Sequence, residues 1–190
     1  MNIGNLELRP LEPCDVDAVV KLSDESVGKG LYTASEIEET VGSDSKFVYV
    51  LKSGEGEIAG YIFFFLTDTD AIVKDAKIDK ETILKALDKS NAKIGRIQSI
   101  AIKEEYRGEG LSEKLIDFAV LKLLELKTEC TFIVCWKKGD FVPLKKTMEE
   151  CKFKYLTEVK KIWYDNERLY CPYCKGRCSC NAEIYYKKVD

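Results

Sequence analysis

Side chains that can bind ligands or react gather at two places in this 190-residue chain. One is a glycine-containing loop from Tyr106 to Ser112, and the other is a run of four cysteines from Cys171 to Cys180. Histidine, the commonest general base and metal ligand of proteins, is absent from the whole sequence. Hydrolases that depend on a histidine partner are therefore excluded, and any metal must be held by thiolates or carboxylates.

The glycine-containing loop joins an aliphatic strand pattern to the longest amphipathic helix pattern of the chain. Gly108 and Gly110 lack Cβ atoms, so a ligand oxygen can approach the backbone amides directly. The first turn of a helix leaves about four N–H groups without intrahelical partners, and these groups and the helix dipole favour an anion. Arg107 adds a positive charge and Ser112 a hydroxyl. The loop is therefore predicted to bind phosphate.

Two other phosphate-binding motifs do not match this loop. The dinucleotide fingerprint requires a third glycine and an acidic residue after a following strand, and a Walker loop requires a lysine followed by serine or threonine. Neither pattern follows Gly110. A turn that merely caps the helix is the alternative interpretation, because such glycine pairs are common without a ligand.

The cysteine run has the spacing C-x2-C-x3-C-x-C, which lets four thiolates from one hairpin loop surround a tetrahedral Zn²⁺. Lys175 and Arg177 would partly offset the negative charge of such a site. The predicted zinc ligands are Cys171, Cys174, Cys178 and Cys180. Free or paired thiols and an iron–sulfur cluster are the alternatives. Ferredoxin spacings differ from this one, and a reducing cytosol disfavours disulfides.

Charge and hydropathy limit the partners that we expect. The formal net charge is -3, with an acidic excess in residues 1–135 and a basic excess in 136–190. This asymmetry is either uneven surface charge or a groove that attracts an amine on one side and an anion on the other. A net acidic chain argues against nucleic acid. No apolar run approaches the ~20 residues needed to span a bilayer, and no signal-peptide pattern is present. We therefore expect no membrane partner and a cytoplasmic location.

Hydrophobic periodicity predicts a single α+β domain over residues 1–190, with a central mixed sheet. Residues 68–93 are interpreted as an insertion that contains a helix near 80–89, and broken alternation near Gln98 predicts a bulge. The predicted strands are 6–9, 46–52, 57–67, 94–103, 131–136, 154–165 and 182–189. The other predicted helices begin near residue 15 or span 33–41, 110–127 and 141–151.

Together with the strand before it, the loop resembles the coenzyme motif of the GNAT superfamily of N-acetyltransferases, which is Arg/Gln-x-x-Gly-x-Gly/Ala after an aliphatic triplet. The triplet is Ile100-Ala101-Ile102, and the motif reads Arg107-Gly108-Glu109-Gly110-Leu111-Ser112. Ser112 departs from the family pattern, because it places a side chain where the motif has Gly or Ala. The likeness extends to the opening strand and helix and to residues 141–153.

This resemblance implies a mixed β-sheet that is flanked by helices and splayed between its fourth and fifth strands, with acetyl-CoA in the gap. It implies that the pantetheine amides pair with Ile100, Ala101 and Ile102. The residues implied to bind the diphosphate are Arg107, Gly108, Glu109, Gly110, Leu111 and Ser112. Lys145 and Lys146 either lie near the adenosine end of the coenzyme or form an ordinary solvated helix face.

The catalytic residues are not assigned by the sequence. In the family, a tyrosine of the penultimate helix often protonates the departing thiolate, and Met148 stands at that place. A thioether has no proton to donate. Cys135, Tyr164 and Gln98 are conceivable substitutes, although each is equally compatible with a purely structural role.

The activity that the resemblance implies is transfer of an acetyl group from acetyl-CoA to a primary amine of a small molecule or protein. Two alternatives stay open: a non-catalytic acyl-CoA sensor, and an interaction module with a structural zinc site that binds no coenzyme. The sequence is compatible with a monomer or a homodimer.

Overall fold

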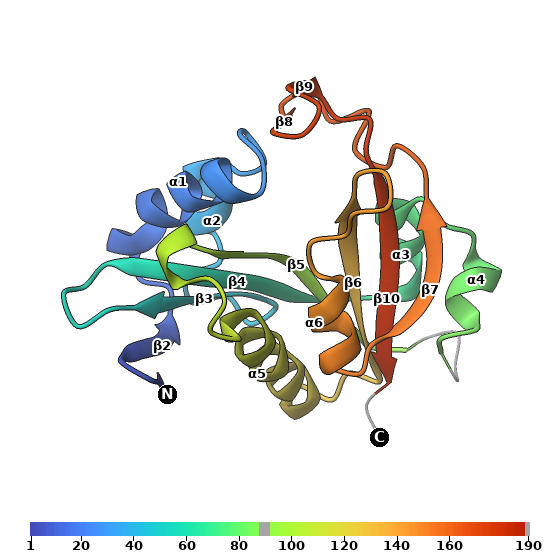
Figure 1. Ribbon diagram of the computed structural model, residues 1–190. Helices are drawn as coiled ribbons and strands as arrows, with labels where there is room; N and C mark the ends of the chain where they lie inside the picture. Colours follow the sequence, from blue (N-terminus) through green and yellow to red (C-terminus); the bar gives the residue numbers. More distant parts are fainter. Residues whose placement is uncertain (88–91, 189–190) are drawn as a thin grey trace.

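The computed structural model describes residues 1–87 and 92–188. The strands in these residues are β1 (Asn2–Ile3), β2 (Leu6–Pro10), β3 (Lys46–Lys52), β4 (Ile58–Thr67), β5 (Ile94–Ile102), β6 (Cys130–Lys137), β7 (Lys154–Val159), β8 (Tyr170–Cys171), β9 (Gly176–Arg177) and β10 (Asn181–Lys188). Eight of them form one sheet in the order β1-β2-β3-β4-β5-β6-β10-β7, and β8 pairs with β9 separately (Figure 1).

The helices of the described residues are α1 (Val16–Ser26), α2 (Ala34–Glu38), α3 (Thr69–Ala76), α4 (Lys80–Leu84), α5 (Leu111–Glu125) and α6 (Lys145–Glu150), with 3-10 turns η1 (Pro13–Asp15) and η2 (Glu104–Tyr106). Apolar residues of α1 and α2 pack on one face of the sheet, and those of α5 and α6 pack on the other (Figure 1). In this part of the chain, no helix has the length and hydropathy needed to cross a bilayer.

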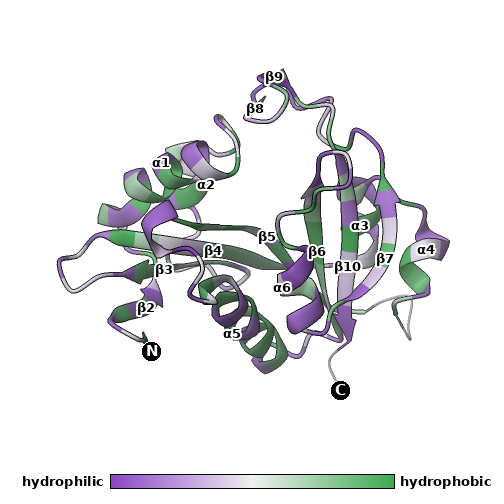
Figure 2. Ribbon diagram, in the orientation of Figure 1, coloured by the Kyte–Doolittle hydropathy of each residue, from purple (hydrophilic) through white to green (hydrophobic). Residues whose placement is uncertain are grey.

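The sheet is mixed, because β5 and β6 run parallel whereas its other neighbouring strands run antiparallel. The predicted hairpin over 46–67 is confirmed as β3 and β4. The central strand β4 is apolar on both faces and mostly buried, in keeping with helices on both sides (Figure 2). The predicted fold class, a mixed sheet flanked by helices with a small cysteine-rich hairpin near the C-terminus, is confirmed.

Helix α5 is held close against β5 by one glycine. A Cβ on Gly95 would lie 2.6 Å from a methyl carbon of Leu123, so the strand and helix could not keep this separation with a larger residue. The predicted apolar stripe is confirmed, since Leu115, Ala119 and Leu123 are all fully buried. This packing fixes where α5 begins relative to the end of β5.

Some predicted boundaries are wrong. Helix α6 begins at Lys145 instead of residue 141, because Pro143 disfavours helical backbone at the residue before it. Strand β7 ends at Val159, well before residue 165. Of the helix expected over 80–89, α4 covers 80–84, and residues 88 and 89 lie outside the described part. Helix α3 was not predicted, although Asp68 accepts a hydrogen bond from the N–H of Ala71 as its N-cap.

A buried ion pair ties β6 to β10 and β7. Glu183 of β10 is 9% exposed, and Lys137 Nζ lies 2.7 Å from a carboxylate oxygen of both Glu183 and Glu158. Tyr185 donates its hydroxyl proton to Glu183. Burial acts to raise the pKa of Glu183, but Lys137 and Tyr185 outweigh it and hold that pKa below its ordinary value.

Substituting Glu183→Gln is expected to lower the free energy of unfolding by about 1 kcal/mol near pH 7, because it removes one of the two carboxylates that pair with Lys137 and the charged acceptor of the Tyr185 hydroxyl. The native pKa is depressed, so the stabilisation is complete above the unfolded pKa and is lost as the pH falls through the folded one. Urea unfolding should therefore show a difference that shrinks as the pH falls below the ordinary glutamate pKa of about 4.3. The exposed hairpin residue Glu55→Gln is the control; an equal loss there would refute the assignment.

Candidate functional site

Strands β5 and β6 separate after a short parallel stretch. Their pairing runs from Ile94 opposite Cys130 to Ile97 opposite Ile133, and it stops there although both strands continue. These are the fourth and fifth strands of the sequence-based prediction, and the sheet splays between them as expected. Beyond Ile97, the edge of β5 that faces β6 has no strand partner among residues 1–87 and 92–188.

A bulge lies at the point where the two strands separate. In the ladder with β4, Phe64 pairs with Ile97 and Phe63 pairs with Ser99, so Gln98 is the extra residue. The predicted bulge is confirmed. A bulge turns the following segment relative to the preceding one. It therefore helps to direct residues 99–102 away from β6.

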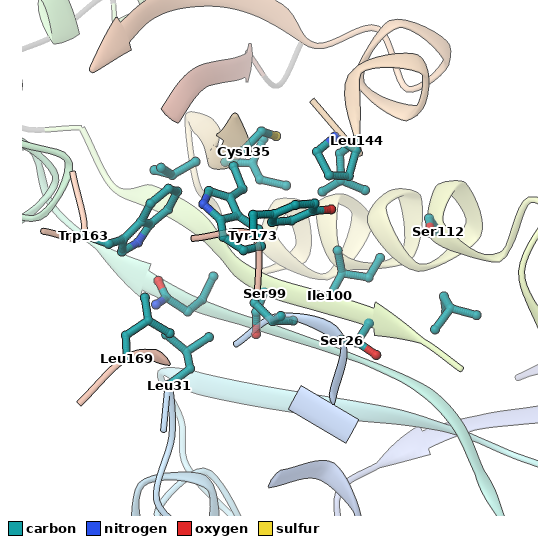
Figure 3. A pocket seen from close by; sticks show the side chains of 18 of the residues that line it. Ser26, Leu31, Ser99, Ile100, Ser112, Cys135, Leu144, Trp163, Leu169 and Tyr173 are labelled. Atoms are coloured by element: carbon teal, nitrogen blue, oxygen red, sulfur yellow. The ribbon is translucent and has the colours of Figure 1, made fainter. Parts of the chain in front are cut away.

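The gap between the strands contains a cavity of about 410 Å³ (Figure 3). Its walls come from β5 and β6, from the start of α5, from the segment before α6 and from the loop that carries β8. Of the predicted coenzyme residues, Ile100, Ala101, Ile102, Arg107 and Ser112 line it. The cavity is large enough for the acyl end of a coenzyme together with a small second substrate.

The loop before α5 has the geometry of an anion cradle. Gly108 and Gly110 have φ of 88° and 70°, values that side chains rarely allow, and no side chain caps the helix at Gly110. A Cβ on Gly108 would meet nothing within 4 Å, so the loop is open on that side. The amides of the first turn of α5 therefore remain available to a ligand.

A second cavity, of about 200 Å³, adjoins this loop and is lined by Arg107, Gly108, Gly110, Leu111 and Ser112 among others. Glu109 does not line either cavity and is exposed, so its contribution is limited to backbone. Eight of the nine predicted coenzyme residues thus line two cavities, which share Ile102, Arg107 and Ser112.

Charged side chains surround the smaller cavity. Arg107 donates from Nε to the carbonyl of Ile102 at 2.9 Å, which ties the loop back to the end of β5. Lys146 lines this cavity, whereas Lys145 does not, so only one of the two predicted basic residues is near. Glu113 also lines it, and a hydrogen bond with Glu150 raises the pKa of the Glu113 carboxyl.

The candidate proton donors differ in whether they line the larger cavity. Met148 is fully buried within the core and no residue of α6 lines the larger cavity, so the expected donor position offers no proton there. Cys135 and Gln98 line the larger cavity, and burial raises the pKa of the Cys135 thiol far above its ordinary value. Tyr164 does not line the cavity; the guanidinium carbon of Arg177 lies 4.2 Å from the centre of its ring.

A chain of buried hydroxyls begins at the cavity and was not predicted. Tyr32 donates to Ser99 at 2.9 Å, and Ser99 donates to Tyr61 at 3.2 Å. Burial raises the pKa of both tyrosines, so both hydroxyls stay protonated and neutral. Ser99 lines the cavity and can offer its oxygen to a bound group. No short sequence motif links Tyr32 to Ser99, because the contact exists only in the folded sheet.

The four cysteines of the C-terminal loop come together. Their sulfur atoms all lie within 4.8 Å of one another, and Cys180 is 3.9 Å from Cys171 and 3.5 Å from Cys174. Ligands 2.3 Å from a tetrahedral zinc ion are about 3.8 Å apart, so the cluster fits that ion. The N–H of Cys174 points to the sulfur of Cys171 at 3.3 Å, as expected of a thiolate knuckle.

One cysteine of the cluster is readily ionised. Burial opposes ionisation of Cys174, but hydrogen bonds from the hydroxyl and N–H of Ser179 and from neighbouring thiols lower its pKa to about 6. The side chain of Lys138 lies 3.7 Å from the same sulfur. Burial raises the pKa of Cys171 and Cys180, so Cys174 is the cysteine of the cluster that ionises most easily without a metal.

The sequence did not predict that the cysteine-rich loop would reach the cavity. Trp163, Leu169 and Tyr173 line it, together with Trp136 of β6 and Leu31 of the α1–α2 loop (Figure 3). The ring of Tyr173 lies 4.4 Å from that of Trp136, centre to centre. Aromatic residues inside and beside a C-x2-C motif were a usable signal, since a metal loop rarely needs large apolar side chains for itself.

Comparisons with known proteins agree with this geometry. A family model described as "Acetyltransferase (GNAT) family" matches residues 17–153. No curated protein matches the chain. Arabidopsis thaliana NAA60 in complex with acetyl-CoA is similar in structure, with a TM-score of 0.73 and 11% identity over 97% of this chain and 98% of that one.

Two further structures have the same fold. Ard1 from Thermoplasma volcanium has a TM-score of 0.67 and 15% identity, covering 98% of this chain and 99% of that one. A variant of spermidine N-acetyltransferase SpeG from Vibrio cholerae has a TM-score of 0.63 and 15% identity, covering 98% and 95%. Because the family model matches well over half of the sequence, the chain belongs to the GNAT family of acetyltransferases, and the predicted acyltransferase class is confirmed.

Proposed function

We propose that this protein transfers the acetyl group of acetyl-CoA to a primary amine. The observation that carries the proposal is the open start of α5 beside the unpaired edge of β5, because these two features offer N–H groups to a diphosphate and to a pantetheine chain along one path. The structure of NAA60 with acetyl-CoA supports the choice of coenzyme.

In this proposal, the coenzyme lies in the gap between β5 and β6. The amides of the pantetheine arm pair with the backbone of Ile100, Ala101 and Ile102, and the diphosphate rests on residues 107–112. Arg107 supplies positive charge from the end of β5, and Lys146 supplies it from α6. Ser112 is partly exposed, so its hydroxyl can add a hydrogen bond.

The chemistry requires a neutral amine and a stabilised oxyanion. The amine loses a proton to solvent, its nitrogen bonds to the thioester carbonyl carbon, and the carbon–sulfur bond then breaks with its electrons on sulfur. The amide product releases the second nitrogen-bound proton, and the thiolate takes a proton from water. A mainly apolar cavity lowers the pKa of a bound ammonium, which favours the reactive amine. Gln98 and Ser99 are the polar side chains of the bulge placed to orient it.

We also propose that Zn²⁺ is bound by Cys171, Cys174, Cys178 and Cys180. The sulfur separations and the N–H groups directed at sulfur support this assignment over free thiols. Its role in this proposal is to fix the fold of the loop around β8 and β9. Such a site suits the cytoplasm, where thiols stay reduced.

A non-catalytic acyl-CoA sensor is the second candidate function, and the burial of Met148 favours it. With a thioether at the position where the family often has a tyrosine, and no α6 side chain at the larger cavity, the thiolate leaves unprotonated in this proposal. Neither candidate requires a second copy of the chain, and a homodimer stays an open prediction.

Acetyl-CoA should raise the melting temperature of the protein, and Gly110→Glu should abolish the rise by placing a carboxylate at the diphosphate. Since Gly110 has a positive φ, Ser112→Asp offers the same charge without backbone strain and should weaken binding about tenfold or more. Gly54→Glu, in an exposed turn with open space, is the control. Unaltered binding in both site variants would eliminate the proposed cradle.

Incubation with acetyl-CoA and an amine should release free thiol at a rate that depends on the amine concentration. A thiol reagent that absorbs light on reaction provides the measurement. Coenzyme binding without amine-dependent release, across small amines and peptides, would favour the sensor instead.

The purified, reduced protein should contain about one zinc ion per chain. Cys174→Ser should lower the metal content and the melting temperature, because it removes one of four ligands. Cys14→Ser is the matched control, since Cys14 is exposed and lies outside the cluster. Absence of metal in the wild-type protein, even after zinc addition, would contradict the assignment.

A further inference from the structure

The segment 160–180, which we call the strap, is joined to both sides of the splayed sheet. On the α1–α2 side, the N–H of Tyr170 donates to the carbonyl of Lys29 at 2.8 Å, and the N–H of Lys29 donates back at 3.2 Å. Arg168 forms an ion pair with Glu36 at 3.0 Å. Figure 1 shows β8 and β9 above the space between α1 and β6.

Two glycines of the α1–α2 loop make room for the strap. A Cβ on Gly28 would lie 2.7 Å from a methyl carbon of Leu169, and a Cβ on Gly30 would collide with the carbonyl oxygen of Arg168. Gly30 also has a φ of 77°, which other residues rarely adopt. The close approach of the strap is thus built into the α1–α2 loop.

On the β6 side, the strap is held by aromatic packing. Tyr173 and Trp163 both contact Trp136, with ring centres 4.4 and 6.3 Å away. Within the strap, Leu169 and the cysteines of the proposed zinc site form a buried cluster. Tyr173 lies between Cys171 and Cys174 in sequence, so ligation of these two cysteines fixes the position of its ring.

The strap and its contacts form one end of the larger cavity. Trp163, Leu169 and Tyr173 come from the strap, Trp136 from β6 and Leu31 from the α1–α2 loop (Figure 3). These five side chains are aromatic or aliphatic. Among the described residues that line the cavity, none is an aspartate or glutamate.

We propose that this end of the cavity is the acceptor subsite, and that it takes a small primary amine with an aromatic or aliphatic body. The inference rests on the proposed function and names its substrate class. A polyamine needs carboxylates for its several charges, and this wall offers none. A peptide needs an open groove, whereas the strap closes this end by contacts to both sides. The zinc-clipped strap is the wall that such an amine packs against.

The two tryptophans of the chain are both at this wall, so intrinsic fluorescence reports on the strap without any substrate. Removing zinc with a chelator under reducing conditions should red-shift the tryptophan emission and increase its quenching by acrylamide. It should raise the KM for the amine about tenfold, because the wall is lost, while the Kd for acetyl-CoA changes less than about threefold.

Gly30→Ala tests the strap with all four cysteines intact. Its Cβ should push the strap outward and produce the same rise in amine KM and in quenching. Gly42→Ala is the matched control, since Gly42 also has a positive φ, 71°, but open space around its Cβ. Tyr173→Ala should likewise raise the amine KM, and Tyr173→Phe, which keeps the ring, should recover most of the affinity.

The substrate class is tested with 2-phenylethylamine, spermidine and a short lysine peptide as acceptors. The proposal expects the lowest KM for 2-phenylethylamine. A lower KM for spermidine or the peptide overturns the proposal. It is also overturned if zinc-free protein and Gly30→Ala both keep the wild-type acrylamide quenching and the wild-type amine KM. Failure of the wild-type protein to bind acetyl-CoA would instead refute the proposed function, so the two failures are distinguishable.

Discussion

The end of the hydrogen-bonded ladder between β5 and β6 is the feature on which the rest of the site depends. Four pairs of residues hold the strands together, up to Ile97 and Ile133, and the bulge at Gln98 then turns β5 aside. A sheet that continued its pairing would satisfy every backbone group and leave no cavity. Because pairing stops, β5 keeps an edge of amides and carbonyls that must find a partner in water or in a ligand. The proposed coenzyme path follows directly from this incomplete strand pairing.

The start of α5 extends that path, and its position depends on packing some distance away. Because Gly95 has no side chain, Leu123 packs directly on β5, and this contact sets the distance between α5 and the strand. The positive φ angles of Gly108 and Gly110 then direct the first N–H groups of the helix toward the smaller cavity. Arg107 is anchored to the carbonyl of Ile102, so its charge is held at the junction of strand and loop. These residues therefore contribute by fixing the positions of the helix and loop backbone, and Arg107 also contributes its charge.

The sequence predicted the features that depend on local pattern. The glycine loop, the helix after it, the hairpin over 46–67 and the bulge near Gln98 are all encoded within short windows. It did not predict what depends on distant contacts. Tyr32 and Ser99 form their hydrogen bond although they are 67 positions apart in the sequence. Leu169 reaches the cavity because Gly28 and Gly30 leave room for the strap. The predicted start of α6 is wrong for a local reason, since Pro143 disfavours helical backbone at the residue before it.

The contact between the strap and the α1–α2 loop also has a consequence for how the chain assembles. The ion pair of Arg168 and Glu36 joins residues 132 positions apart, so it forms only when nearly all of the polypeptide is in place. The elements of the coenzyme path, from β4 to α5, are neighbours in sequence and can associate earlier during synthesis. A nascent chain that has passed α6 therefore already contains the residues proposed to bind the diphosphate, whereas the proposed amine subsite is still open to solvent.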